Sequence, residues 1–128
     1  MIDTNQYTVK TNCAIVSVAV HQIFKVNHHN NYEITFKDVQ EIFALYKDYR
    51  KKEIVNKMLI IGAWKTSMNS DARQLVQTLI YDTLAEGIVV KSFSERIIAN
   101  FYFMVKPKAY PIKLFSTEEA AINWLNSL

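Results

Sequence analysis

Two short apolar runs constrain the fold of this chain more than any other feature. Each run lies next to a segment with a helical pattern. The two runs are Met58–Trp64 and Gly87–Lys91. A strand that is covered on both faces is continuously apolar instead of alternating, so both runs are predicted to be inner strands. Pro111 then admits a last short strand at Ile112–Phe115.

Four segments with helical patterns alternate with these strands. The first is predicted to start at Thr35, whose hydroxyl can cap a helix with Asp38 in the first turn, and to run to about Lys52. Its predicted buried face comprises Val39, Ile42, Phe43, Tyr46 and Tyr49. The second follows the Asn69-Ser70 cluster, and its apolar positions are Ala72, Leu75, Val76, Leu79, Ile80 and Leu84.

The remaining helix boundaries rest on capping signals. Gly87 is predicted to end the second helix as a left-handed cap. A third helix is expected at 95–105, before Pro107. Ser116 and Glu119 have capping-box spacing and predict the start of a fourth helix. The predicted buried side of that helix comprises Ala121, Trp124, Leu125 and Leu128.

The N-terminal region is predicted to open with a β-hairpin. Its strands are Tyr7–Thr11 and Ala14–Val20, and the segment 21–33 is expected to continue as a strand that fades into an exposed loop. Repeated strand-helix-strand units require mostly parallel pairing. The expected fold is therefore α/β, with a mixed, mostly parallel sheet of about five strands and four helices.

Length and composition favour a single domain spanning residues 1–128, with only two glycines and two prolines. The net charge of +3 is spread along the chain, which argues against nucleic-acid binding. A signal peptide and a membrane-spanning apolar run are both lacking in the sequence, so we expect a cytoplasmic protein without stable membrane insertion. Cys13 is the only cysteine, which excludes an intramolecular disulfide.

The C-terminal third carries a family resemblance. Residues 96–103, Lys106-Pro107 and 111–125 resemble the small bacterial STAS-like (SpoIIAA-like) proteins of unknown activity. The match is close over about the last forty residues and looser over the rest of the chain. The resemblance implies the STAS fold, in which many relatives bind partner proteins and distant ones bind lipids or nucleotides.

The same resemblance draws attention to Ser70. In anti-sigma-factor antagonists of this fold, a phosphorylatable serine in an Asp-Ser-Ser-Gly type sequence starts the helix after the central strand. Here the corresponding residues read Asn69-Ser70-Asp71-Ala72, so Ser70 takes the place of the switch serine while its neighbours differ.

Two interpretations of this cluster stay open. Asn69 or Ser70 caps the second helix, or Ser70 accepts a phosphate. Arg73 would support the phosphate, whereas Asp71 would repel it.

The predicted third helix is apolar nearly all round, because Asn100 is the only polar residue between Ile97 and Val105. A neighbouring loop or the terminal helix could cover its outer side; alternatively, the cover is a homodimer mate, another protein or a lipid-like ligand. The candidate surface comprises Ile98, Phe101, Tyr102, Phe103 and Val105.

No catalytic, metal or cofactor motif is evident in the sequence. His21, His28 and His29 are expected to be exposed loop residues without the companion ligands of a metal site, and Cys13 is expected to be a small buried apolar residue. We therefore expect a non-enzymatic interaction or regulatory domain that binds no metal or cofactor. The alternative is a carrier of a lipid or other small apolar ligand beneath the third helix.

Overall fold

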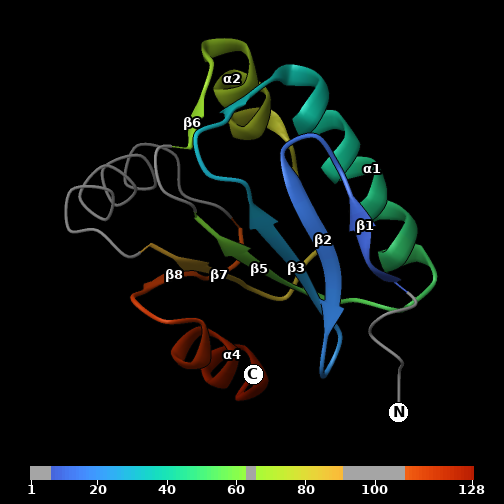
Figure 1. The fold of residues 1–128 in the computed structure, drawn as a ribbon. Helices are drawn as coiled ribbons and strands as arrows, with labels where there is room; N and C mark the ends of the chain where they lie inside the picture. The colour runs from blue at the N-terminus through green and yellow to red at the C-terminus, as the bar shows by residue number, and fades with distance from the viewer. Residues whose placement is uncertain (1–6, 63–65, 91–108) are drawn as a thin grey trace.

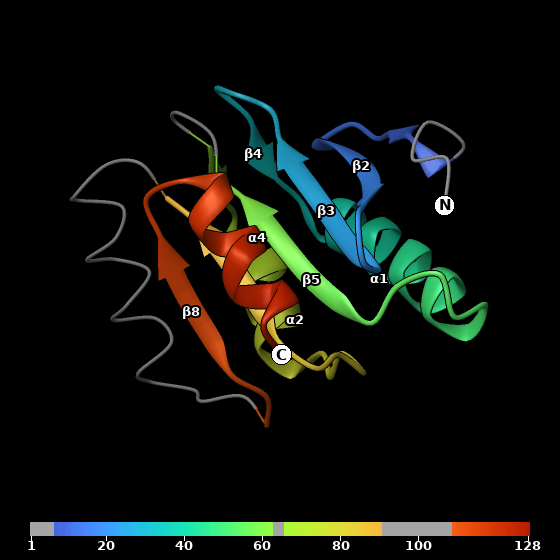
Figure 2. The same ribbon diagram turned by 90° about the horizontal axis from the view of Figure 1, so that it is seen from below.

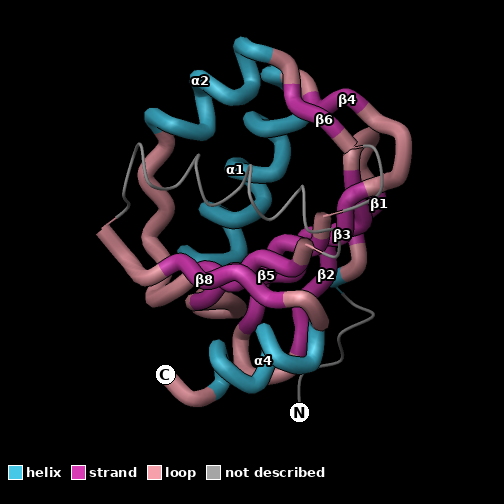
Figure 3. The backbone as a smooth tube through the Cα atoms, turned by 90° about the vertical axis from the view of Figure 1, so that its left-hand side faces the viewer, coloured by secondary structure: helices cyan, strands magenta, loops and turns pink. Residues whose placement is uncertain are grey.

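A six-stranded mixed sheet forms the centre of the molecule in the computed structural model, which describes residues 7–62, 66–90 and 109–128 (Figure 1). The strand order is β1-β2-β3-β5-β7-β8. Helices α1 and α2 lie on one face of the sheet and α4 lies on the other (Figure 3). The model thus has the predicted α/β architecture.

The N-terminal half of the sheet is antiparallel. Strand β1 (Val9–Lys10) pairs with β2 (Ala14–Ala19), which confirms the predicted hairpin. Strand β2 also pairs antiparallel with β3 (Ile23–His28), a strand within the segment that was expected to fade into a loop. The turn between them contains His21 and Gln22, with φ angles of 68° and 66°. Neither residue is glycine, so the usual hairpin signal is missing from the sequence.

The other half of the sheet is parallel. Strand β3 pairs with β5 (Lys57–Ile61), β5 pairs with β7 (Glu86–Val89), and β7 pairs with β8 (Ile112–Phe115). Two of the predicted apolar runs therefore lie next to each other as inner strands. The unexpected β3 makes this a sheet of six strands, where about five were predicted.

Helix α1 (Phe36–Lys51) forms where the sequence predicted it. Thr35 caps the helix, because its hydroxyl accepts a hydrogen bond from the Asp38 amide while the Asp38 carboxylate accepts one from the Thr35 amide. Its buried face packs on the sheet, where the Tyr46 ring meets Phe24 edge-to-face at a centroid distance of 5.1 Å.

Helix α2 (Ser70–Thr78) is shorter than predicted, and Gly87 does not cap it. Gly87 lies inside β7, and neither glycine of the chain has a positive φ. Gly87 instead faces α4, where a Cβ atom would lie at ordinary contact distance, 3.4 Å from Leu125 Cδ1 and 3.6 Å from Ala121 Cβ. The prediction of a C-terminal cap was therefore wrong.

Helix α4 (Glu118–Asn126) covers β5, β7 and β8 on the face opposite to α1 (Figure 2). Thr117 is the cap instead of Ser116, because the Thr117 hydroxyl accepts a hydrogen bond from the Ala120 amide. Ala121 and Leu125 are buried as predicted, but Leu128 is exposed. The described residues contain three helices, and the predicted helix at 95–105 lies outside them.

The core has two parts, one on each face of the sheet. The larger part lies between the sheet and α1, and the smaller one lies beneath α4. Among the described residues, no helix has the length and apolar character required to cross a lipid bilayer.

Candidate functional site

Ser70 is the first residue of α2, and its side chain is exposed. Asn69 caps this helix: its side-chain Oδ1 accepts a hydrogen bond of 2.9 Å from the Ala72 amide. The Ser70 hydroxyl has no hydrogen-bond partner among the described residues. Of the two caps left open by the sequence, the structure selects Asn69, and the Ser70 hydroxyl is accessible.

A two-stranded parallel ribbon fixes where α2 begins. Strand β4 (Glu33–Ile34) pairs with β6 (Ser67–Met68), and the Asn69 amide donates a hydrogen bond of 3.1 Å to the Ile34 carbonyl oxygen. Each strand is followed directly by a helix cap, Thr35 for α1 and Asn69 for α2. The starts of the two helices therefore lie side by side (Figure 1).

Asp71 and Arg73 complete the exposed first turn of α2. Neither residue forms an ion pair with any residue that the structure describes. Arg73 is three positions after Ser70, so both side chains belong to the same side of the helix, whereas Asp71 is the direct neighbour of Ser70. The structure thus brings together all four predicted residues of this cluster.

The predicted partner surface on the third helix cannot be placed in the same way. Its residues, Ile98, Phe101, Tyr102, Phe103 and Val105, lie outside the described residues.

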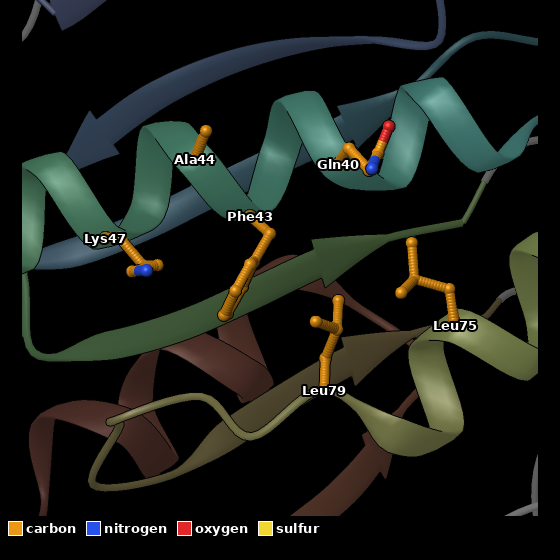
Figure 4. Close-up of a pocket in the computed structure, with 6 residues that line it drawn as sticks. All are labelled: Gln40, Phe43, Ala44, Lys47, Leu75 and Leu79. Atoms are coloured by element: carbon orange, nitrogen blue, oxygen red, sulfur yellow. The ribbon is translucent and has the colours of Figure 1, made fainter.

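A cavity that the sequence did not reveal lies between α1 and α2. Its volume is about 280 Å³, and its lining residues are Gln40, Phe43, Ala44, Lys47, Leu75 and Leu79. Figure 4 shows Leu75 of α2 and Leu79, just after the helix, directed towards α1, with the Phe43 ring directed towards the same space. Phe43 was assigned to the buried face of the first helix, and Leu75 and Leu79 to the apolar face of the second. They sit at the borders of those faces, where periodicity does not distinguish a sheet contact from a contact with a second helix.

The start of α1 carries a polar network beside this region. Asp38 is buried, and its Oδ2 atom accepts hydrogen bonds from the Thr35 amide at 2.9 Å and from the Tyr32 hydroxyl at 2.8 Å. The hydrogen bond to the carboxylate raises the pKa of Tyr32 to about 12. These contacts stabilise the start of α1 and occupy the Asp38 carboxylate with hydrogen bonds.

His28 is half-buried and Cys13 is fully buried. His28 is in β3, not in an exposed loop as predicted, and burial lowers its pKa to about 4. Its Nδ1 atom is buried without a hydrogen-bond partner among the described residues. Cys13 is fully buried, as predicted, and burial raises the pKa of its thiol. At neutral pH the thiol is therefore protonated and is a poor nucleophile.

The described part of the chain contains no group of three or more histidine, cysteine, aspartate or glutamate side chains arranged to hold a metal ion.

Comparison with known proteins supports the fold and gives no activity. A family model described as a domain of unknown function (DUF7793) matches residues 17–128. The chain is also similar to the crystal structure of an uncharacterized protein of the DUF3478 family with a SpoIIAA-like fold, from Shewanella loihica PV-4. That likeness has a TM-score of 0.58 and 13% sequence identity, and covers 92% of this chain and 89% of the other. No curated protein matches. The structural likeness supports the STAS-like fold that the C-terminal residues predicted.

Proposed function

Because this chain belongs to the DUF7793 family of domains of unknown function and has a SpoIIAA-like fold, we propose that it is a non-enzymatic regulatory domain that binds a protein partner. Phosphorylation of Ser70 would control this binding. The observation that carries the proposal is the exposed Ser70 hydroxyl at the first position of α2, next to a cap that Asn69 already provides.

The position suits an added phosphate for two physical reasons. The helix N-terminus has a positive dipole end, and Arg73 lies one turn away on the same side. A phosphate brings a charge of about −1.5 to −2, so the surface around Ser70 would change from weakly charged to strongly acidic. The carboxylate of Asp71 would repel the phosphate. The attraction of the phosphate to the helix dipole and to Arg73 must be larger than this repulsion.

Two exposed apolar side chains beyond the C-terminal end of α2, the end opposite to Ser70, support a contact surface on this side of the sheet. Ile80 is 82% exposed and Leu84 is 53% exposed, and both lie in the connection between α2 and β7. Apolar side chains in one exposed segment are typical of a surface that a partner covers.

The test of the switch is phosphopeptide mapping of the protein isolated from cells that naturally produce it. Trypsin cleaves after Lys65 and Arg73, which releases a peptide that contains both Ser67 and Ser70. We expect a phosphate on Ser70, its loss in Ser70→Ala and its retention in Ser67→Ala, an exposed serine three residues earlier. A peptide that stays unmodified when the cognate kinases are active would contradict the proposal.

A separate experiment tests the predicted partner surface on the third helix. We propose that it binds a second copy of the chain, so that Tyr102→Glu and Phe103→Glu would convert a dimer to a monomer in analytical ultracentrifugation. Lys37→Glu, at an exposed position of α1, is the control and should leave the dimer intact. A monomer for the unaltered protein would refute the homodimer and would leave the Ser70 switch standing.

A further inference from the structure

We propose that the cavity between α1 and α2 binds a medium-chain aliphatic carboxylate, with the chain between the helices and the carboxylate beside Lys47. The inference is independent of the Ser70 switch, because it rests on different residues.

The walls of the cavity fit an aliphatic chain. Phe43 and Ala44 come from α1, Leu75 comes from α2, and Leu79 is the residue that follows α2 (Figure 4). The volume of about 280 Å³ is near the lower end of the range of about 300–1,000 Å³ for ligand sites. This size favours a single medium-length chain over a bulky lipid with two chains.

Lys47 supplies the charge that selects the head group. Its ammonium lies over the Phe43 ring, 5.4 Å from the ring centroid. Arg50 of the same helix pairs with Asp82, and Lys52, the residue after the helix, pairs with Asp48, whereas Lys37 and Lys51 have no carboxylate partner among the described residues. Among the described residues Lys47 has no such partner, so a bound carboxylate would complement a charge at the cavity that the protein leaves unmatched. Gln40 adds an amide that can donate a hydrogen bond.

The cavity is held in shape at both ends. At one end, the ribbon of β4 and β6 joins the starts of the two helices. At the other, the Tyr46 hydroxyl and Arg50 Nε of α1 donate hydrogen bonds of 2.7 Å and 3.0 Å to the Asp82 carbonyl oxygen. The Phe43 ring is fixed between them by an edge contact with Tyr81 at a centroid distance of 4.9 Å. A preformed cavity lowers the cost of ordering on binding.

The experiment is an NMR titration of the isotope-labelled protein with octanoate below its micelle concentration, with 1-octanol as the uncharged probe of equal chain length. For octanoate we expect the largest amide shifts in residues 40–47 and 75–79. Lys47→Gln should weaken octanoate binding about fivefold, as expected for loss of an exposed charge contact, and should leave 1-octanol binding unchanged. Lys51→Gln, one turn further along α1 and outside the cavity lining, is the matched control and should bind octanoate normally.

Leu79→Trp fills the cavity and should abolish both titrations, with circular dichroism showing that the variant is folded. Ser70→Ala should bind octanoate as the unaltered protein does, which separates this inference from the phosphorylation switch. An absence of shifts at the cavity, or unchanged octanoate binding by a folded Leu79→Trp, would overturn the site. Equal affinity of Lys47→Gln and the unaltered protein for octanoate would overturn the assignment of the carboxylate to Lys47.

Discussion

The hydroxyl of Tyr46 donates a hydrogen bond of 2.7 Å to the backbone carbonyl oxygen of Asp82, across 36 residues of sequence. Tyr46 is almost completely buried against Phe24 of the sheet, whereas Asp82 lies in the exposed connection after α2. This contact joins the middle of α1 to the segment that leads into β7. It therefore fixes the position of the connection after α2. In this position the chain is not helical at Ile80 and Leu84, the last residues of the predicted apolar stripe.

Removal of this hydroxyl should destabilise the fold. Tyr46→Phe is expected to lower the free energy of unfolding by about 1 kcal/mol, because the Asp82 carbonyl retains its bond from Arg50. The measurement is urea unfolding. Tyr49→Phe is the matched control on the same buried face, since the Tyr49 hydroxyl forms no hydrogen bond within the described residues, and its loss should be within about 0.5 kcal/mol. Equal losses for both variants would argue against the Tyr46–Asp82 bond.

The cap of α2 can be assigned by a second pair of substitutions. Asn69→Ala should cost about 1 kcal/mol of stability, since the Ala72 amide loses its acceptor. Ser70→Ala should have little effect, because its hydroxyl caps nothing in the structure. Denaturant unfolding measures both changes. If the serine substitution proved the more harmful, Ser70 would be the cap.

The two glycines should respond differently to alanine. Gly87→Ala is expected to be tolerated or to stabilise by up to about 1 kcal/mol, because its backbone is extended and the new Cβ would make ordinary contacts with α4. At Gly62 the new Cβ would lie 3.2 Å from the Val89 carbonyl oxygen, a backbone atom, so Gly62→Ala should destabilise. Thermal unfolding of the two variants gives the comparison. A marked loss at Gly87 would point back to a left-handed cap.

His28 should make the fold sensitive to acid. Burial lowers its pKa from 6.5 to about 4, with a smaller contribution from His29. Between these values the unfolded chain binds a proton that the folded protein does not, so stability falls as the pH drops from 6.5 towards 4. The loss from this residue is roughly 3 kcal/mol, and it changes no further below pH 4.

Urea unfolding at several pH values tests this dependence. His28→Gln should remove most of the slope between pH 6.5 and 4, whereas His21→Gln, in the exposed turn before β3, should leave it in place. A slope that survives in His28→Gln would assign the acid sensitivity to other groups.

Local signals predicted the elements that are stabilised locally. Thr35 and Asp38 mark the start of α1 because their capping interactions lie within four residues of sequence. The strand after Pro111 was likewise predicted with its observed bounds, Ile112–Phe115. For α1 the neighbouring residues contain the physical reason for the structure, whereas for β8 Pro111 sets only the start of a strand that pairs with the distant β7.

The incorrect predictions concern features that depend on distant parts of the chain. Strand β3 lacks a clear alternation because it pairs with β2 and β5 and has two consecutive buried residues, Ile23 and Phe24. Leu79, Ile80 and Leu84 continue a helical period, but the chain leaves the helix at Leu79. The cavity depends on how α1 and α2 lie against each other, which no periodicity within one helix specifies. Ser70 was found only through the resemblance of its surroundings to a family motif.

The ribbon of β4 and β6 gives the protein a short geometric link between surface and interior. One hydrogen bond joins Asn69 to Ile34, and one peptide unit then separates Ile34 from Thr35. A rearrangement that unwinds the first turn of α2 would also disturb the start of α1, because the ribbon of β4 and β6 joins the two helix starts. A chemical change at the exposed Ser70 is therefore only a few bonds away from the start of α1, the helix whose aromatic rings pack on the sheet.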